Sequence, residues 1–349
     1  MKIAVECSKL NTDKKTGTHR FLIGFLEELS LRKDISITFY FNKLDKNLVN
    51  YKFLKKGSVV TLNQENYTQL GLLKELNKYD YFVFPWQTVP VLNFLYGGNV
   101  IAIIHDLGFT FKTKLFTFLA LIFSKKLFSV SKTTADRLFR KSVLITEGVD
   151  SRIFYKIKEV ELPKLKKQYN VPEKFLLSVG RIEERKNIFN NLEAFSKISK
   201  FYPSLKYCFI GNFELEEKII YSFIDKLEID RNQVVFKDYV SDEELNVYLN
   251  SCELLIFTSQ HEGFGLPVLE AYAVGKWVIL SKIQQLADLS LTAKQLVDQN
   301  NPKEIAESIV YFLSNKLKLK KDFLPENLLN THSWKNSVDL FLEGLSNGK

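Results

Sequence analysis

Short apolar, β-branched and aromatic segments alternate along the chain with longer segments whose apolar positions recur every three to four residues. This alternation is typical of βαβ units, in which helices join parallel strands. A first helix is predicted over Phe21–Leu31. Strands are predicted in the first half at Ile3–Val5, Ile35–Tyr40, Tyr81–Phe84, Val100–Ile104 and Leu127–Val130. In the second half they are predicted at Phe175–Val179, Tyr207–Ile210, Val234–Phe236, Leu254–Thr258 and Val278–Ser281.

The two series of strands predict an α/β fold of two facing Rossmann-like, doubly wound parallel-sheet domains. A charged stretch of low periodicity, 156–167, predicts the linker, and Ser333–Leu345 has helical spacing. We therefore expect one domain over 1–160, a second over 161–330, and a C-terminal helix in 331–349 that packs back on the first domain. Ligands bind such sheets at the carboxyl ends of the strands, so an interdomain cleft is expected there.

Composition excludes several classes of protein. Of the 349 residues, 46% are hydrophobic and 26% charged, which is ordinary for a globular chain and unlike a disordered one. No apolar run reaches the ~18 residues that span a bilayer, and the start lacks a signal-peptide apolar region, so we expect a cytoplasmic protein. The three cysteines are expected to be buried structural thiols, and no His pair has zinc-ligand spacing.

Charge is unevenly distributed. Residues 1–165 carry a net charge of +11 and residues 166–349 a net charge of −2. The basic half indicates either an anionic membrane surface as partner or simply a lysine-rich exterior. No helix-turn-helix or RNA-binding aromatic signature accompanies the charge, which argues against nucleic acid. The segment Leu115–Phe128 fits a helix at a membrane surface or a buried core helix, and its length favours the buried one.

The segment Leu254–Ala271 predicts a strand, a glycine-rich loop and a helix. Pro267 suits the first helical turn, where its missing N–H costs no hydrogen bond. The backbone N–H groups there would point at an anion, and the helix dipole favours a phosphate. We therefore predict a phosphate-binding loop at Phe264, Gly265 and Leu266.

Two carboxylates flank this loop. Glu262 lies in it and Glu270 lies in the early turns of the helix, so both can face one cleft and accept hydrogen bonds from the hydroxyls of a ribose or hexose. Val268 occupies the third glycine position of the dinucleotide-binding fingerprint, which disfavours a nicotinamide enzyme.

A second loop follows the predicted strand Phe175–Val179. The strand delivers Gly180 to the cleft, and Arg181 and Lys186 follow on the loop. Two cations there would neutralise a diphosphate before and after its bond to a sugar breaks. The alternative is a surface loop with ordinary charges.

The run His261–Ala271 resembles the Glu-x7-Glu motif of retaining glycosyltransferases of family four, which have the GT-B fold. The Gly-Arg…Lys-Asn pattern that begins at Gly180 occurs in the same family. The resemblance implies that Arg181 and Lys186 bind the donor diphosphate and stabilise the leaving group. It implies that Glu262 orients the hexose and that Glu270 holds the ribose.

Other segments resemble the same family. His105, after a predicted strand, corresponds to a histidine that contacts the donor sugar. Gly17 corresponds to a glycine loop by the diphosphate, here reduced from paired glycines to one, and the backbone of Tyr239 and Val240 corresponds to nucleobase contacts. The segment 147–150 also matches, and we expect a structural role for it.

Two departures from the family pattern fall near the predicted donor site. Lys276 and Trp277 stand where the family has a small residue and Pro, and 282–285 replaces a polar turn. We expect these differences to reshape the donor pocket.

The resemblance implies a retaining hexosyltransferase. No Asp-x-Asp motif occurs in the sequence, so we expect no metal ion to bridge the diphosphate and the enzyme to be metal-independent. The first domain would bind the acceptor and the second the nucleotide sugar. The motifs look most like mannosyltransferases of surface polysaccharides, so no cofactor is expected and GDP-hexose is favoured as donor over UDP-hexose. The expected partners are a glycan or lipid-linked acceptor and an anionic membrane surface, with peripheral attachment at the inner membrane face and no nucleic acid.

Other activities stay open. A nucleotide-sugar-binding protein without turnover is one alternative, although Glu262, Glu270, Arg181 and Lys186 are all present. A phosphorylase or an epimerase of the same fold is another.

Overall fold

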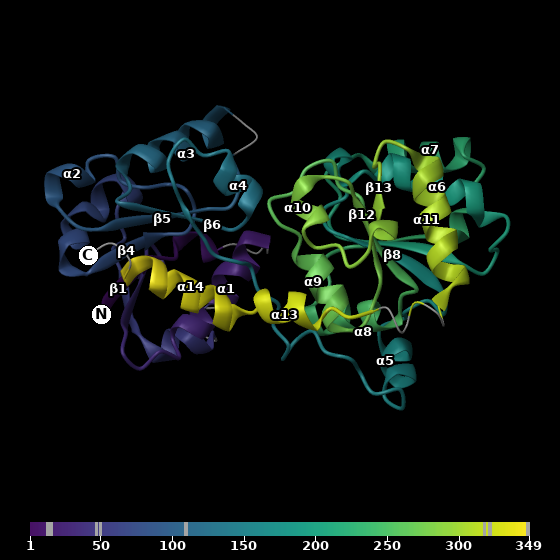
Figure 1. The fold of residues 1–349 in the computed structure, drawn as a ribbon, viewed down its shortest axis with the longest axis horizontal. Coiled ribbons are helices and arrows are strands. Elements are labelled where there is room, and N and C mark those ends of the chain that lie inside the picture. The colour runs from purple at the N-terminus through teal and green to yellow at the C-terminus, as the bar shows by residue number, and fades with distance from the viewer. Residues whose placement is uncertain are drawn as a thin grey trace. The chain divides into compact units, whose positions relative to one another are not determined.

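The computed structural model describes residues 1–11, 17–45, 48, 51–107, 111–316, 319 and 323–346. The chain forms two compact units, each a parallel sheet between layers of helices (Figure 1). Unit 1 consists of Met1–Gly148 and His332–Lys349, and unit 2 consists of Val149–Thr331. Both sheets are doubly wound, which confirms the predicted α/β class.

Unit 1 contains a parallel sheet of seven strands in the order β3-β2-β1-β4-β5-β6-β7. All five strands predicted for this half are present within one residue at each end. The two that were not predicted, β3 and β7, are short edge strands. The strands are β1 Lys2–Glu6, β2 Ser36–Phe41, β3 Ser58–Thr61, β4 Tyr81–Phe84, β5 Val100–Ile104, β6 Lys126–Ser129 and β7 Val143–Leu144.

Both faces of this sheet are buried, which explains why its strands are continuous apolar runs. In β5, Ile101 and Ile103 pack into the core on one face. Val100, Ala102 and Ile104 pack into the core on the other face. Helices cover the two faces: α1 Gly17–Leu29, α2 Asn93–Tyr96, α3 Phe111–Phe123, α4 Lys132–Asp136 and α14 Trp334–Ser346.

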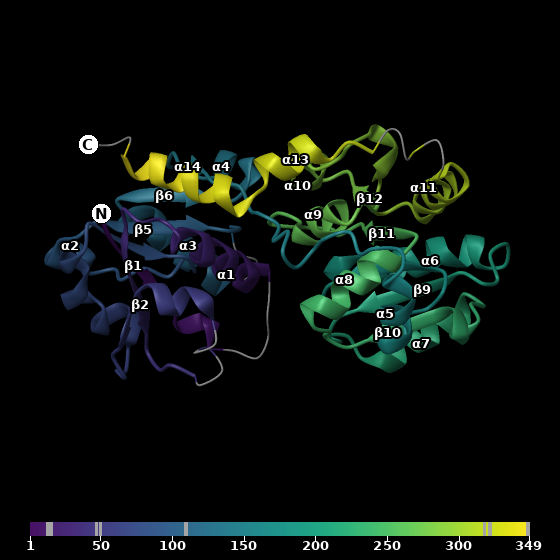
Figure 2. The same cartoon turned by 90° about the horizontal axis from the view of Figure 1, so that it is seen from below.

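The last helix, α14, belongs to unit 1 and lies beside α1 (Figures 1 and 2). Gly24 of α1 permits the close approach, because a Cβ there would lie 2.2 Å from the Trp334 indole. Phe25 meets Phe341 edge to face, with ring centroids 5.2 Å apart. The chain thus returns to its first unit after completing the second.

Unit 2 contains six parallel strands in the order β10-β9-β8-β11-β12-β13. The five predicted strands are again present, and the two-residue edge strand β13 was not predicted. The strands are β8 Phe175–Val179, β9 Lys206–Ile210, β10 Val234–Lys237, β11 Leu254–Phe257, β12 Val278–Ser281 and β13 Leu296–Val297. The helices are α5 Leu162–Gln168, α6 Ile188–Ser199, α7 Glu217–Lys226, α8 Asp242–Ser251, α9 Leu266–Ala273, α10 Gln284–Ala287, α11 Pro302–Ser314 and α13 Glu326–Thr331.

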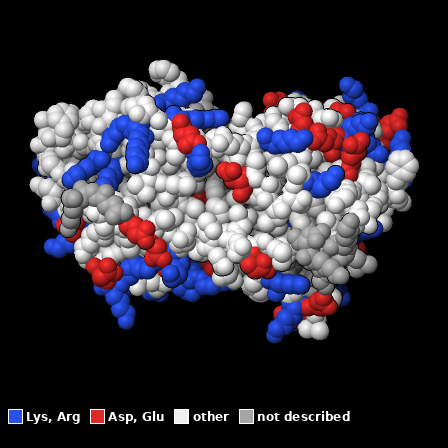
Figure 3. Space-filling view, viewed as in Figure 1, with Lys and Arg blue, Asp and Glu red and all other residues white. Residues whose placement is uncertain are grey.

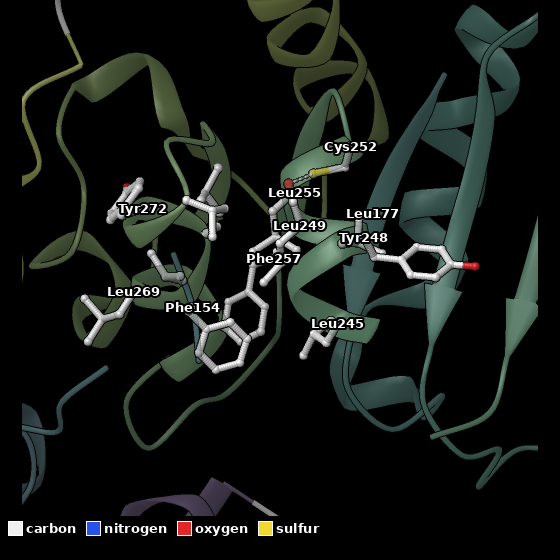
Figure 4. Close-up of a cluster of buried hydrophobic side chains, with 14 of the residues drawn as sticks. Phe154, Leu177, Leu245, Tyr248, Leu249, Cys252, Leu255, Phe257, Leu269 and Tyr272 are labelled. Atoms are coloured by element: carbon white, nitrogen blue, oxygen red, sulfur yellow. Dashed lines mark hydrogen bonds between the residues drawn. The ribbon is translucent and has the colours of Figure 1, made fainter. Parts of the chain in front are cut away.

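The strands of this sheet also contribute side chains to two hydrophobic cores, one on each face. Leu177 and Phe257 point to the core beneath α8 and α9, which Figure 4 shows in close-up. Leu176 and Ile256 point to the opposite core, against α6 and α11. The strand ends are therefore fixed from both sides, which gives the loops after β8 and β11 a rigid base.

Two local expectations need correction. The first stretch of unit 1 ends at Gly148 and not at residue 160 as predicted. The second half of the predicted linker, 156–167, forms helix α5, with Pro163 in its first turn. The helix predicted as a buried one, Leu115–Phe128, corresponds to α3 and the start of β6. Its outer face is exposed at Leu115, Phe118 and Ile122.

The three cysteines are buried, as predicted. Burial raises the pKa of the Cys208 thiol to about 12 and that of Cys252 to about 11, so both stay protonated at neutral pH. The pKa of the Cys7 thiol is also raised, because the thiol is buried and because the nearby Glu6 disfavours a second negative charge. These thiols serve packing.

Candidate active site at the carboxyl edge of the second sheet

The strand order of unit 2 reverses between β8 and β11, so the loops after these two strands diverge and leave a crevice at their carboxyl ends. A pocket lies at this point. It is lined by Ser178, Val179, Gly180, Arg181, Ile182, Lys186, Ile188, Phe209, Ile256, Phe257, Thr258 and Ser259. Three of the predicted donor-site residues, Gly180, Arg181 and Lys186, are among them.

An ion pair joins the two loops. Lys186 Nζ donates to Glu262 Oε1 at 2.6 Å. The same ammonium lies 4.8 Å from the Phe257 ring centroid, and both partners of the pair are largely buried. The structure therefore brings together two residues predicted from separate motifs.

Arg185 is a second cation on the same carboxylate. Its guanidinium lies 3.4 Å from Glu262 Oε2 and donates to the His261 carbonyl at 2.7 Å. It also donates to Glu183 at 2.8 Å. The sequence prediction did not include Arg185, because nothing in its local pattern separates it from an ordinary surface arginine.

The charge of Glu262 is set by these neighbours. Burial acts to raise the pKa of its carboxyl, but the charges of Lys186 and Arg185 outweigh burial and hold that pKa below the usual value of 4.5. At neutral pH the site therefore presents a buried carboxylate compensated by two cations. Such a group can accept hydrogen bonds from sugar hydroxyls, and the cations can bind an anion.

The floor of the pocket requires glycine. Gly180 has φ +133° and Gly211 has φ +148°, values that other residues rarely adopt. A Cβ at Gly211 would lie 2.1 Å from the Gly180 carbonyl oxygen, so the loops after β8 and β9 touch through bare backbone. A Cβ at Gly180 would lie 3.1 Å from Lys186 Cε. Gly211 thus lets the loops after β8 and β9 approach each other closely, and the missing side chain at Gly180 leaves space for Lys186.

Asn187 fixes the end of the cationic loop. It adopts a left-handed conformation, φ 62°, between the short turn Glu184–Lys186 and helix α6. Its side chain donates to the Gln299 carbonyl at 2.6 Å and accepts from Gln260 Nε2 at 3.1 Å. Gln260 N also donates to the Arg185 carbonyl at 2.8 Å, so the β8 and β11 loops are tied at several points.

Arg181 points to a different group of acids. Its guanidinium lies 3.5 Å from Glu183 and 3.7 Å from Glu214, and the side chain is half exposed. Asn212 connects this loop to the predicted nucleobase segment. Its carbonyl accepts from Ile182 N at 2.9 Å and its side chain from Tyr239 N at 3.2 Å. Asn212 is a further residue that the sequence prediction missed.

Val240 and Tyr239 lie just after β10. Val240 is buried in the core, whereas the Tyr239 side chain is exposed. The predicted cap of the next helix is present, because Ser241 Oγ accepts from Glu244 N at 3.1 Å. The backbone at 239–240 is thus held at the carboxyl edge of the sheet.

Helix α9 begins as predicted, with Pro267 in its first turn. Gly265 precedes it with φ 138°, and Phe264 and Leu266 on either side are buried. Glu270 is also buried, one turn inside the helix. The loop is therefore shaped by two apolar anchors around a glycine.

Lys276 and Trp277, which form one of the two departures from the family pattern, are not among the residues that line the pocket. Trp277 packs against Phe312 and Phe323, with ring centroids 5.2 and 5.0 Å away. Lys276 Nζ donates to the Cys252 carbonyl at 2.7 Å. Both side chains thus pack into the body of unit 2, and an effect of the two departures on the donor pocket stays a prediction.

Two predicted site residues, His105 and Gly17, lie in unit 1. His105 follows β5 and is buried, and its Nε2–H donates to the Pro85 carbonyl at 3.0 Å. Its Nδ1 lies 3.7 Å from Glu147 Oε1, so the 147–150 segment lies beside the predicted histidine. Gly17 is the first residue of α1, and Lys14–Thr16 of the predicted glycine loop lie outside the described residues.

Comparison with known families places this crevice in a known domain. The family Glycosyl transferases group 1 matches residues 162–326, which is nearly all of unit 2. Unit 2 is a glycosyl transferases group 1 domain. The resemblance drawn from the two motif loops is thereby confirmed.

Relatives of the chain include bacterial glycosyltransferases. It is 29% identical over 189 residues to the serotype-specific mannosyltransferase WbdA of Escherichia coli, covering 52% of this chain and 23% of WbdA. It is 27% identical over 156 residues to the O-antigen chain mannosyltransferase B of Escherichia coli, covering 44% of this chain and 40% of that protein. The chain thus spans about a quarter of WbdA and less than half of mannosyltransferase B.

Solved structures extend the similarity to the whole chain. HepE of Anabaena, solved with UDP-glucose, superposes with a TM-score of 0.81 at 18% identity, over 99% of this chain and 100% of that one. The lipopolysaccharide glycosyltransferase WaaG superposes with a TM-score of 0.72 at 14% identity, over 99% of both chains. The group 1 domain therefore lies within a GT-B fold, as the sequence predicted.

Proposed function

We propose that the protein is a retaining hexosyltransferase that moves a mannose-like sugar from a nucleotide diphosphate donor to a hydroxyl of a glycan or lipid-linked acceptor. The observation that carries the proposal is the buried pair of Lys186 and Glu262 at the switch point of the group 1 domain. A cation for the diphosphate and a carboxylate for the sugar stand within one hydrogen bond of each other.

In the proposed mechanism, bound donor lies along the β8–β11 crevice. Lys186, with Arg181 at the rim, binds the diphosphate and stabilises the negative charge that grows on it as the glycosidic bond breaks. Glu262 and His105 orient the hexose and Glu270 holds the ribose. The acceptor hydroxyl attacks on the face that the diphosphate leaves, and its proton passes to a departing phosphate oxygen, so the anomeric configuration is retained.

We propose GDP-mannose or a similar GDP-hexose as donor, with no cofactor. The mannosyltransferase relatives support this choice, and the UDP-glucose complex of HepE makes UDP-hexose the second candidate. We also propose an acceptor made in surface polysaccharide or glycoconjugate synthesis, and an anionic membrane surface as the partner of the basic unit 1. Turnover in the presence of EDTA tests metal independence, and NMR of the product tests retention.

The first experiment is thermal stabilisation by GDP, UDP, ADP, dTDP and their hexose conjugates. At a ligand concentration ~100 times the dissociation constant, binding adds about 2.7 kcal/mol. We expect stabilisation by GDP and its conjugates in the wild-type protein and in Lys226→Ala, a control on exposed helix α7. Lys186→Ala should lose most of it.

Turnover separates an enzyme from a binding protein. With the stabilising donor, Lys186→Ala and Arg181→Ala should each cost about 2–4 kcal/mol of transition-state stabilisation, as the loss of an oxyanion donor does. Near-wild-type rates in both would contradict the assigned roles. Donor binding without turnover on any acceptor would favour the non-catalytic alternative, and no stabilisation by any nucleotide would contradict the whole proposal.

A further inference from the structure

Exposed apolar side chains are concentrated on one part of unit 1. Twenty large apolar side chains are exposed among the described residues, and nine of them lie within 92–139. Four of the nine follow one another along α3 at successive helical turns: Phe111, Leu115, Phe118 and Ile122. Their spacing of four, three and four residues places them in one stripe.

The opposite side of α3 is fixed to the unit, so the stripe faces outward. Thr117, Ala120 and Leu121 are buried. Arg140 donates to the Ser124 carbonyl at 2.8 Å and also to the Leu121 carbonyl, which satisfies the carboxyl end of the helix. The helix is therefore anchored on its inner side, and turning it to hide the stripe would break these contacts.

Two flanking segments widen the stripe. Phe139 lies beside Phe118, with ring centroids 5.8 Å apart. Phe94 of α2 stacks on Phe123 at 6.2 Å, and Asn93 Nδ2 donates to the Phe123 carbonyl at 2.6 Å. We call the combined patch the α3 surface. It consists of Leu92, Phe94, Leu95, Tyr96, Phe111, Leu115, Phe118, Ile122 and Phe139.

Positive charge is concentrated in the segment that contains α3 and Phe139. Residues 111–141 contain eight Lys and Arg and one acid, Asp136, which pairs with Lys132 at 2.8 Å. Residues 81–104, which include α2, carry no charged side chain. In Figure 3, blue side chains border uncharged white surface over the elements that Figure 1 labels α2 and α3.

We infer that the α3 surface docks on an anionic lipid bilayer. Phe, Leu and Tyr side chains can enter the interface between headgroups and acyl chains while the surrounding lysines meet anionic headgroups. A second copy of the chain fits less well, because two such basic faces would repel each other. The surface gives the membrane partner of the proposed function a location, and in that respect the inference rests on that function.

The expected strength follows from the two kinds of side chain. Burial of one large apolar side chain changes partition about tenfold or more. Each lysine near an anionic surface contributes about 1 kcal/mol, which is about fivefold. A patch with nine exposed apolar residues and a basic border therefore needs no lipid anchor for measurable binding to vesicles.

The test is flotation of the purified chain with vesicles of phosphatidylcholine, with and without phosphatidylglycerol. We expect binding only to the anionic vesicles, and weaker binding at raised salt. Phe111→Ser should weaken it about tenfold, and the double variant Lys112→Gln/Lys114→Gln about 25-fold. Phe201→Ser is a matched control in unit 2, because Phe201 is 81% exposed and Phe111 is 83% exposed. It should bind like the wild type.

Three results would overturn the inference: no binding to anionic vesicles, equal binding to both kinds of vesicle, or equal losses in Phe111→Ser and Phe201→Ser. A fourth result would come from sedimentation, which measures the oligomeric state. If the wild type were a dimer and Phe111→Ser a monomer, the α3 surface would serve self-association instead. Circular dichroism and nucleotide stabilisation of each variant check the fold. The vesicle assay contains no donor, so its failure and a failure of nucleotide binding are separate results.

Discussion

Glu262 is a carboxylate that stays charged although it is buried. Burial alone would raise its pKa, and the opposite shift depends on the two cations that reach it from the loop after β8. The pair therefore stabilises the folded protein only while the carboxyl is ionised. This gives the site a pH dependence whose sign is fixed.

Glu262→Gln tests that dependence. The folded-state pKa lies below the usual 4.5, so the stabilisation is fully present above that value and is lost as the pH falls through the folded-state pKa. We expect the variant to be less stable than wild type by about 1–2 kcal/mol at pH 7, with the difference shrinking below pH 4.5. Urea unfolding at several pH values measures it. A difference that grows on acidification would contradict the assigned charge state.

The sequence predicted the partners of this pair but not the whole arrangement. Lys186 and Glu262 belong to motifs at the ends of two recognisable strands, and parallel strands bring their carboxyl ends to one edge. The choice between Arg181 and Arg185 as second cation depends on a three-residue turn and on the left-handed Asn187. Apolar periodicity carries no information about either.

Central strands were predicted well, whereas of the four edge strands only β10 was predicted. The central strands β5 and β8 are apolar on both faces because both faces are buried, which produces a strong signal in the sequence. β3 is mostly exposed, and β7 and β13 have two residues each. Helix α3 shows a related limit, since an apolar helix has the same composition whether its outer face is covered or exposed.

The contact between the loops after β8 and β9 predicts a difference between two glycines. Gly211→Ala places a Cβ against the Gly180 carbonyl at a backbone angle that alanine avoids, so we expect a loss of about 3 kcal/mol of stability. Gly17→Ala is the control, because a Cβ there meets no described atom within 4 Å. It should change stability by less than about 0.5 kcal/mol. Urea unfolding compares them, and equal losses would contradict the close approach.

At the scale of the molecule, unit 1 is built from two separate stretches of chain. Phe341 of α14 is fully buried against Phe25 and Phe128. Phe341→Ala should destabilise unit 1 by about 3–5 kcal/mol, whereas Phe139→Ala, an exposed phenylalanine of the same unit, should have little effect.

Tryptophan fluorescence can report on unit 1 alone. The three tryptophans are Trp86 and Trp334 in unit 1 and Trp277 in unit 2. In a Trp277→Phe background, urea unfolding followed by fluorescence monitors unit 1, and the Phe341→Ala transition should move to lower urea. A transition that does not move would show that α14 adds no stability to unit 1.

The position of α14 also has a consequence for how the protein is made. The ribosome synthesises Gly148 184 residues before His332, the first residue of the C-terminal segment that completes unit 1. At a synthesis rate of ~5–20 residues per second, the apolar side of α1 stays uncovered by α14 for roughly 10–40 s. During that interval unit 2 is synthesised in full. The unit that begins first is therefore completed last, and nascent chains pass through a stage at which unit 2 has been synthesised while unit 1 still lacks α14.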